Sequence, residues 1–133
     1  MQSRLTTSGI WVRDGKVLIA RRSAGGEIGS LWEFPGGKNR PGETLQQTLN
    51  REFTEELGVS VDVGREVFVH HFTNRGILYE LHVFLVGSDQ QALVHPGINS
   101  QLRWVRPDEL SGYDLVPSDR ACLDAVISAL GTT

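Results

Sequence analysis

The sequence predicts an α+β sandwich in which a mixed β-sheet lies between helices, built as one domain over residues 1–133. Three observations favour this fold class. β-rich segments come first, one strongly periodic helix follows them, and further β-rich segments precede a final helix. With 133 residues, of which 39% are hydrophobic, the chain is long enough for one core and too short for two ordinary domains.

Six segments have the apolar, β-branched and aromatic composition of strands. The Asp14-Gly15 pair between the first two favours a tight hairpin turn, and a second hairpin is expected across residues 73–76. Loops are expected at residues 23–30 and 87–97. The predicted strands span residues 5–12, 17–20, 31–34, 59–72, 78–86 and 102–105.

Two segments have helical patterning. Residues 43–57 contain neither glycine nor proline, and their apolar side chains recur every four residues, so they predict an amphipathic helix that Gly58 ends. Pro117 opens a last helix, whose apolar side continues to Leu130. Cys122 lies on that apolar side and is expected to be an unreactive core thiol.

The composition argues against several classes of protein. A net charge of −3 and a pI near 5.8 disfavour general binding to nucleic acid or anionic lipid. The single cysteine excludes an internal disulfide and suits a reducing compartment. The N-terminus lacks the apolar run of a signal peptide, and no stretch approaches the length of about 18 apolar residues that a membrane span needs. We therefore expect a cytoplasmic protein with no membrane or nucleic-acid partner.

Three carboxylates are expected to share one face of the helix at residues 43–57. Glu52, Glu55 and Glu56 fall within an arc of about 100°, because successive residues are about 100° apart. Their repulsion costs roughly a few tenths of a kcal/mol per pair, and a hard cation such as Mg²⁺ would remove it. Arg51 beside them can hold a carboxylate or meet a phosphate. A solvated acidic helix face is the alternative interpretation of the triplet alone.

The residues around this triplet resemble a known motif. The segment 37–59, GKNRPGETLQQTLNREFTEELGV, fills every fixed position of the Nudix box, G-x5-E-x7-R-E-U-x-E-E-x-G-U, where U is a bulky apolar residue. The preceding segment 31–38, LWEFPGGK, together with Ala-Arg-Arg at 20–22, is similar to the MutT-like branch of that superfamily, which includes the 8-oxo-dGTP diphosphatases. The resemblance extends over about residues 5–130 and implies a single Nudix hydrolase domain.

The resemblance implies a reaction and a set of catalytic residues. Nudix hydrolases use Mg²⁺ or Mn²⁺, and MutT-like members release pyrophosphate from a nucleoside triphosphate by attack of water at the internal phosphorus. Carried onto this chain, the metal ligands would be the Gly37 carbonyl and the side chains of Glu52, Glu55 and Glu56. Glu52, with Glu55 beside it, is expected to take the proton from the attacking water, and Arg51 to orient a carboxylate.

The resemblance also implies residues that bind the nucleotide. Arg21 and Lys38 would face phosphates, and Phe34 could stack on the base, although a buried strand aromatic is the ordinary alternative. Asp119 lies where the 8-oxo-dGTP-cleaving members have an asparagine that contacts the base. An ionised Asp could accept from N–H groups of 8-oxoguanine or from the amino group of cytosine. Helix capping by Ser118 and Asp119 is the alternative.

One position departs from the MutT-like pattern. Many members carry an acid six positions before the tryptophan of the late strand, which is Trp104 here, and this chain has Ile98 there, followed by Asn99. Neither side chain can act as an anionic ligand or a base, and the nearest earlier acid is Asp89. We therefore place the general base within the box, on Glu52.

These observations predict a Mg²⁺-dependent MutT-like pyrophosphohydrolase that removes noncanonical triphosphates such as 8-oxo-dGTP, a role in DNA repair. A CTP- or dCTP-cleaving enzyme is the main alternative, motivated by Asp119. A catalytically silent nucleotide-binding domain is the third, motivated by Ile98. The partner in each case is a small nucleotide, and the protein is expected to be a monomer or a homodimer.

Overall fold

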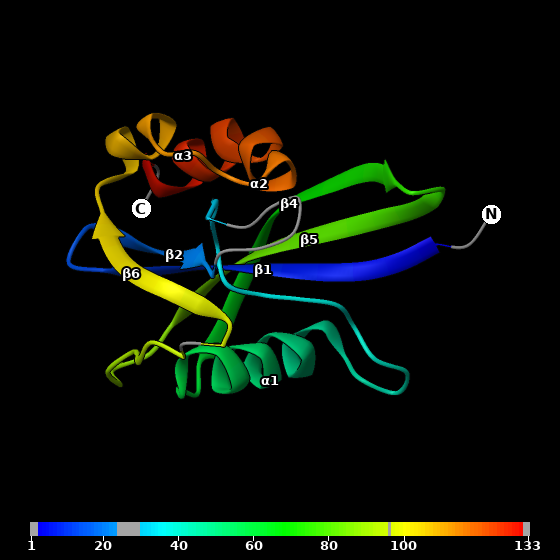
Figure 1. The fold of residues 1–133 in the computed structure, drawn as a ribbon, viewed down its shortest axis with the longest axis horizontal. Helices are drawn as coiled ribbons and strands as arrows, with labels where there is room; N and C mark the ends of the chain where they lie inside the picture. Colours follow the sequence, from blue (N-terminus) through cyan, green and yellow to red (C-terminus); the bar gives the residue numbers. More distant parts are fainter. Residues whose placement is uncertain (1–2, 24–29, 96, 132–133) are drawn as a thin grey trace.

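The computed structural model describes residues 3–23, 30–95 and 97–131, and its elements form three layers (Figure 1). Helix α1 covers one face of the β-sheet, and α2 and α3 cover the other, which confirms the predicted α+β sandwich. No helix in these ranges is long and apolar enough to cross a membrane. In chain order the elements are β1 (Ser3–Arg13), β2 (Lys16–Arg22), β3 (Trp32–Glu33), α1 (Leu45–Leu57), β4 (Asp62–Asn74), β5 (Ile77–Gly87), β6 (Asn99–Val105), the 3-10 helix η1 (Pro107–Gly112), α2 (Pro117–Ala121) and α3 (Leu123–Gly131).

The sheet is mixed because β1 and β5 run parallel while all its other described strand pairs are antiparallel. Strand β4 extends the β1–β5 pair on one side, and β3 and β6 flank β2 on the other. Strands β1 and β2 pair beside their hairpin, where Val12 lies opposite Val17 and Arg13 opposite Lys16. Farther from the hairpin, β1 has room for another partner.

The segment from Pro35 to Asn39 occupies that room and pairs with β1. The Gly9 N–H donates to the Pro35 carbonyl (2.8 Å), the Thr7 N–H donates to the Gly37 carbonyl (2.9 Å), and the Asn39 N–H donates to the Leu5 carbonyl (3.0 Å). The start of the Nudix box is therefore fixed to the centre of the sheet by backbone hydrogen bonds.

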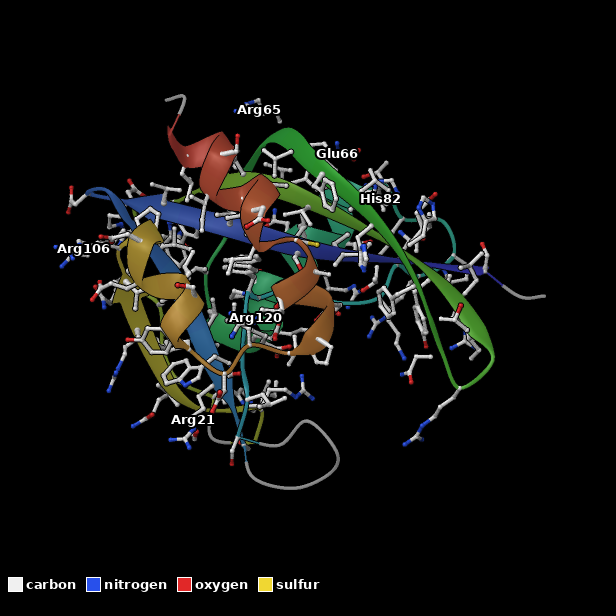
Figure 2. The ribbon with its side chains drawn as sticks, turned by 90° about the horizontal axis from the view of Figure 1, so that it is seen from above. Arg21, Arg65, Glu66, His82, Arg106 and Arg120 are labelled. Atoms are coloured by element: carbon white, nitrogen blue, oxygen red, sulfur yellow. The ribbon has the colours of Figure 1, made fainter. Side chains whose placement is uncertain are left out.

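Both predicted hairpins have two-residue turns. Asp14 and Gly15 have φ values of 54° and 76°, and Arg75 and Gly76 have values of 52° and 77°. Paired positive φ angles match the right-handed twist of the flanking strands, which is why Asp-Gly-type sequences favour hairpins. Between β4 and β5, polar side chains bridge the strands, as in the 2.9 Å contact of Glu66 with His82 (Figure 2).

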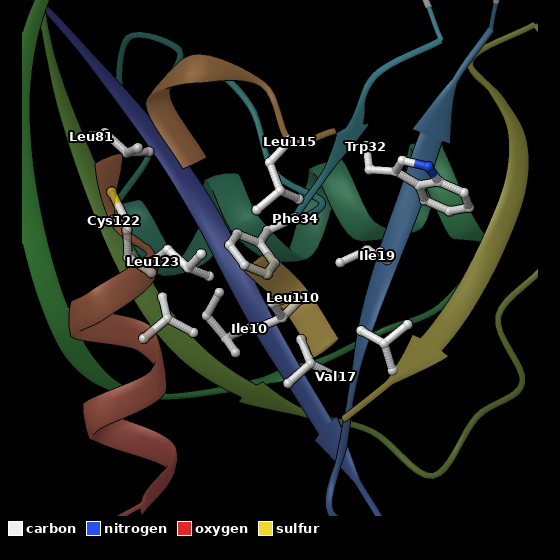
Figure 3. Close-up of a cluster of buried hydrophobic side chains, with 13 residues drawn as sticks. Ile10, Val17, Ile19, Trp32, Phe34, Leu81, Leu110, Leu115, Cys122 and Leu123 are labelled. Atoms are coloured by element: carbon white, nitrogen blue, oxygen red, sulfur yellow. The ribbon is translucent and has the colours of Figure 1, made fainter. Parts of the chain in front are cut away.

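Two apolar clusters hold the helices on the sheet. Under α1, the cluster includes Trp11 of β1, Leu18 of β2 and Phe53 of the helix. Figure 3 shows the other cluster, which lies between the sheet and the C-terminal helices. Its labelled members are Ile10, Val17, Ile19, Trp32, Phe34, Leu81, Leu110, Leu115, Cys122 and Leu123. Cys122 is 1% exposed, and burial raises the pKa of its thiol to about 12, as expected for an unreactive core residue.

Some boundaries differ from the predicted ones. Helix α1 begins at Leu45, because Thr44 caps it through a reciprocal capping box with Gln47. The predicted last helix is two helices, since Cys122 ends α2 in a tight turn and α3 follows. Strand β4 begins at Asp62 rather than at residue 59, β6 extends back to residue 99, and η1 was not predicted. Of the predicted loops, residues 24–29 and 96 lie outside the described residues.

Candidate active site

Arg51 is the centre of a polar network that joins α1 to the loop before it. Its guanidinium donates to both carboxylate oxygens of Glu43 (2.7 and 3.0 Å), to Glu52 Oε1 (2.8 Å) and to the Lys38 carbonyl (2.9 Å). Hydrogen bonding from Arg51 lowers the pKa of Glu43 to about 2. Arg51 therefore ties the loop before α1 to the helix and holds the Glu52 carboxylate of the predicted triplet most closely.

The predicted triplet is divided between buried and exposed side chains. Glu56 is 6% exposed, and burial, followed by the charges of Glu33 and Glu52, raises its pKa to about 9. Burial also raises the pKa of Glu52. Glu55 is exposed and reaches Arg51 at 3.4 Å and Arg40 at 3.9 Å. A buried carboxylate that is repelled by a half-buried one is costly without a cation beside them.

Gly36 and Gly37 allow the backbone to approach these carboxylates. A Cβ atom on Gly37 would lie 2.4 Å from the carboxylate carbon of Glu52, so any larger residue would push that side chain out of this position. The Gly36 N–H donates to Glu56 Oε2 at 3.2 Å. The Gly37 carbonyl accepts both the N–H and the hydroxyl of Thr7 at 2.9 Å, so binding a metal there would require release of the Thr7 hydroxyl.

The donor set suits a hard divalent cation. Carboxylate oxygens and backbone carbonyls are the ligands that Mg²⁺ and Mn²⁺ prefer, and a cation would relieve the repulsion between Glu52 and Glu56. Within residues 3–23, 30–95 and 97–131, no three His, Cys, Asp or Glu side chains are already gathered around one point. Glu55 is directed to Arg51 and Arg40 instead, and ligation by all three glutamates would require it to turn.

A cavity of about 650 Å³ lies on the other side of the Gly36–Gly37 backbone. It is polar near β1 and Lys38 and aromatic near β4 and β5, where Phe72 and Tyr79 stack with ring centroids 5.2 Å apart. Its lining residues are Thr6, Thr7, Ser8, Arg22, Phe34, Gly36, Gly37, Lys38, His70, Phe72, Thr73, Asn74, Tyr79, Leu81, Val116, Pro117 and Ser118.

The structure brings Lys38 and Phe34 to this cavity but leaves Arg21 outside it. Arg21 projects from the outer end of β2, where it donates to the Ser30 carbonyl and to Gln101 (Figure 2). Arg22 lines the cavity and pairs with Glu33 at 2.9 Å. Arg22, the neighbour of Arg21, is therefore the β2 arginine that borders the cavity, and a phosphate contact by Arg21 stays a prediction.

Asp119 lies beneath the cavity rather than in its wall. It is 3% exposed, with Oδ2 accepting the Phe34 N–H at 2.9 Å and Oδ1 accepting the Ser8 hydroxyl at 3.4 Å. Its neighbour Ser118 lines the cavity. Phe34 is 2% exposed and belongs to the apolar cluster under α3, as the ordinary alternative for it predicted. A base contact by Asp119 would need its buried carboxylate to become accessible from the cavity.

Replacing Asp119 with asparagine should make stability less sensitive to pH. Burial raises the pKa of Asp119 from 3.8 to about 7 in the folded protein, so folding disfavours its ionised form. The stability of the wild type should therefore fall as pH rises from about 4 to about 7, and Asp119→Asn should be more stable above pH 7 by about 2–4 kcal/mol.

Urea denaturation of both proteins at pH 4 and pH 8, with a chelator present, measures this difference. An asparagine can keep both bonds, accepting from Phe34 and donating to Ser8. Equal stability is expected at pH 4. If the free energies of unfolding of the two proteins differ by the same amount at both pH values, burial does not raise the pKa of Asp119 and the prediction is wrong.

The histidines of β4 lie on different faces of the strand, so only one of the two adjacent ones reaches the cavity. His70 of β4 lines the cavity, whereas His71 faces the other way and contacts Glu80 at 2.9 Å. His82 contacts both Glu66 (2.9 Å) and Glu80 (3.0 Å). These contacts stabilise the β4–β5 pair away from the cavity.

Two polar residues near the carboxylates were not predicted to belong to the site: Glu33 was not singled out, and Asn99 was considered only as a ligand or base. Glu33 of β3 is half-buried beside Arg22, and its charge acts on Glu56. Asn99 of β6 is fully buried opposite Arg22. Alternation beside the buried Trp32 could have indicated that Glu33 faces α1, but the position of Asn99 depends on an irregularity in β6 that the sequence does not reveal.

Comparisons with known proteins support the family resemblance and the fold. The chain is 38% identical over 116 residues to the CTP pyrophosphohydrolase of Escherichia coli, covering 87% of this chain and 85% of that protein. It is 40% identical over 76 residues to the 8-oxo-dGTP diphosphatase of Proteus vulgaris, covering 56% and 66%. The solution structure of the E. coli ORF135 protein superposes with a TM-score of 0.87 at 36% identity, covering 96% of this chain and 91% of that one. A family model for the NUDIX domain matches residues 7–125, and the chain therefore belongs to the Nudix hydrolases.

Proposed function

We propose that this Nudix hydrolase is a Mg²⁺-dependent nucleoside triphosphate pyrophosphohydrolase that converts noncanonical triphosphates, 8-oxo-dGTP among them, to the monophosphate and pyrophosphate. The observation that carries the proposal is that the half-buried Glu52 and the buried Glu56 lie against the Gly36–Gly37 backbone, which also lines a cavity of about 650 Å³. Relatives with both pyrophosphohydrolase and diphosphatase names support the reaction class.

The chain supplies the groups that such a reaction needs. A divalent ion held by Glu52 and Glu56, with Glu55 turned inward, would neutralise phosphate charge and lower the pKa of water. Arg22 and Lys38 line the cavity and would bind phosphate oxygens. Glu52 would accept the proton of the attacking water, since Arg51 holds its carboxylate at 2.8 Å.

The base would lie at the aromatic end of the cavity. Phe72 and Tyr79 offer ring faces there, and Lys38 Nζ lies 5.7 Å above the Tyr79 ring, which joins the aromatic end to the phosphate end. Ser118 at the start of α2 can exchange hydrogen bonds with a base edge. Such a cavity accommodates an oxidised purine.

A cytidine triphosphate is the second candidate substrate. The similarity to the E. coli CTP pyrophosphohydrolase extends over most of both chains and favours it. The carboxylate of Asp119 accepts one hydrogen bond from Ser8 at 3.4 Å and would have acceptor positions left for the cytosine amino group if that group reached it. Asp119 is thus the residue that would distinguish a cytosine base from an oxidised purine.

Pyrophosphate release measured across a panel of nucleotides tests the proposal. The panel contains 8-oxo-dGTP, dGTP, dCTP, 5-methyl-dCTP, CTP and ADP-ribose, each with Mg²⁺ and with a chelator. We expect turnover of triphosphates that requires the metal, with 8-oxo-dGTP cleaved at the highest kcat/KM. Preference for the cytidine nucleotides would select the second candidate. Absence of turnover for every compound would support the silent nucleotide-binding domain.

A further inference from the structure

Asn99 is the feature near the site that the proposed reaction does not use. Its side chain is completely buried, and neither Oδ1 nor Nδ2 has a hydrogen-bond partner among the residues that the structure describes. An unpaired buried amide costs about 1–3 kcal/mol for each unsatisfied group. Native proteins retain such groups where a bound water or ion completes their hydrogen bonds.

A β-bulge places Asn99 opposite Arg22, on the face of β2 and β6 that α1 covers. On β6, Trp104 and Leu102 pack under α1, so regular alternation would direct Ser100 to that face and Asn99 away from it. The register between β2 and β6 shifts at Arg21 and Arg22, and Asn99 then pairs with Arg22. Bulges commonly re-aim a side chain next to an active site.

Arg22, which lies opposite Asn99 on the neighbouring strand, interacts electrostatically with the candidate metal centre. Arg22 lies in the cavity wall and pairs with Glu33, and the charges of both residues act on the Glu56 carboxylate. Side chains of directly opposed strand residues have Cβ atoms about 5 Å apart. Asn99, Arg22 and Glu33 therefore form a row on the sheet face that α1 covers with Glu52 and Glu56.

We propose that Asn99 is a positioning residue of the metal centre: its amide hydrogen-bonds a water molecule that contacts the divalent ion held by the α1 carboxylates. This inference rests on the proposed function. Residues that orient the groups around a metal typically contribute 10–100-fold to metal affinity or activity. An amide accepts and donates at once, so it can hold a water in one orientation without adding charge beside Glu56.

Replacing Asn99 with leucine, which has nearly the same volume, tests the proposal. Binding of Mn²⁺ alone, followed by electron paramagnetic resonance, should be at least tenfold weaker in Asn99→Leu than in the wild type. The kcat for triphosphate hydrolysis should fall to a similar degree while KM changes little. Urea denaturation in a chelator should show stability equal to or above that of the wild type, because an unsatisfied amide has been removed.

Trp11→Phe is the matched control. Trp11 Nε1 is also buried without a partner among the described residues, but it lies in the apolar cluster under α1. This variant should bind Mn²⁺ and turn over substrate as the wild type does. If Asn99→Leu gains stability and keeps wild-type Mn²⁺ affinity, Asn99 is an ordinary buried amide and the inference is wrong.

Glu56→Gln separates the inference from the proposed function. This variant should no longer bind Mn²⁺ if the metal centre lies at Glu52 and Glu56. If wild type and Glu56→Gln bind Mn²⁺ equally, the proposed metal centre itself fails, whatever Asn99→Leu does. If Glu56→Gln loses binding and Asn99→Leu does not, only the role of Asn99 fails.

Discussion

Glu52→Gln is expected to reduce kcat for triphosphate hydrolysis by about 10²–10⁴-fold, the range observed when a positioned general base is removed. The substitution keeps the shape of the side chain, so the contact with the Gly37 backbone and the acceptor for Arg51 should survive. It removes the negative charge that would bind the cation and take the proton from water. Pyrophosphate release at saturating nucleotide and Mg²⁺ measures the change.

Asp89→Asn is the control for this experiment. Asp89 is the acid that precedes the Ile98 position along the chain, and the structure places it exposed in the loop after β5. Its replacement should leave kcat unchanged. Wild-type turnover in Glu52→Gln would show that our assignment of the metal site and base is incorrect, and loss of turnover in Asp89→Asn would move the base to that loop.

Gly36→Ala is expected to destabilise the folded protein by about 3 kcal/mol or more, beyond the usual cost of overpacking. A Cβ atom at this position would lie 2.1 Å from the carbonyl oxygen of Thr7 and 2.8 Å from Cα of Ser8. Both are backbone atoms of β1 in the centre of the sheet, so they cannot move aside as a flexible side chain would. Urea denaturation measures the loss of stability.

Gly87→Ala at the end of β5 provides the comparison, because its added Cβ would meet nothing within 4 Å. Its stability should lie within about 1 kcal/mol of the wild type. If the two alanine variants unfold at the same urea concentration, the segment 35–39 does not pack against β1 as described. The activity of Gly36→Ala, measured at urea concentrations below its unfolding midpoint, reports whether the site still functions when the Gly36 backbone, which donates to Glu56, is displaced.

Local patterns allowed much of the fold to be predicted from the sequence. Helix α1 follows from the four-residue spacing of its apolar side chains and from Gly58, which caps it in the left-handed conformation with φ of 70°. The hairpins follow from Asp14-Gly15 and Arg75-Gly76, whose backbone angles suit the turn. The mixed character of the sheet also agrees with prediction, and it depends on the parallel pairing of β1 with β5.

Features that depend on long-range register could not be predicted in the same way. Arg22 borders the cavity and Arg21 does not, and this depends on how the end of β2 pairs with β3 and with the irregular start of β6. Asn99 reaches the α1 face through a bulge between two strands about 80 residues apart in the chain. The burial of Asp119 depends on Phe34 and Ser8, which come from distant segments.

The carboxyl group beneath the cavity affects how kinetic data on this protein should be interpreted. With a pKa of about 7, Asp119 changes charge in the pH range where enzymologists look for a general base. It supports Phe34 and Ser8 at the nucleotide cavity and touches neither Glu52 nor Glu56. Asp119 is therefore a second candidate, besides the proton acceptor of the reaction, for an inflection near neutral pH in the rate profile, and the profile of Asp119→Asn distinguishes the two.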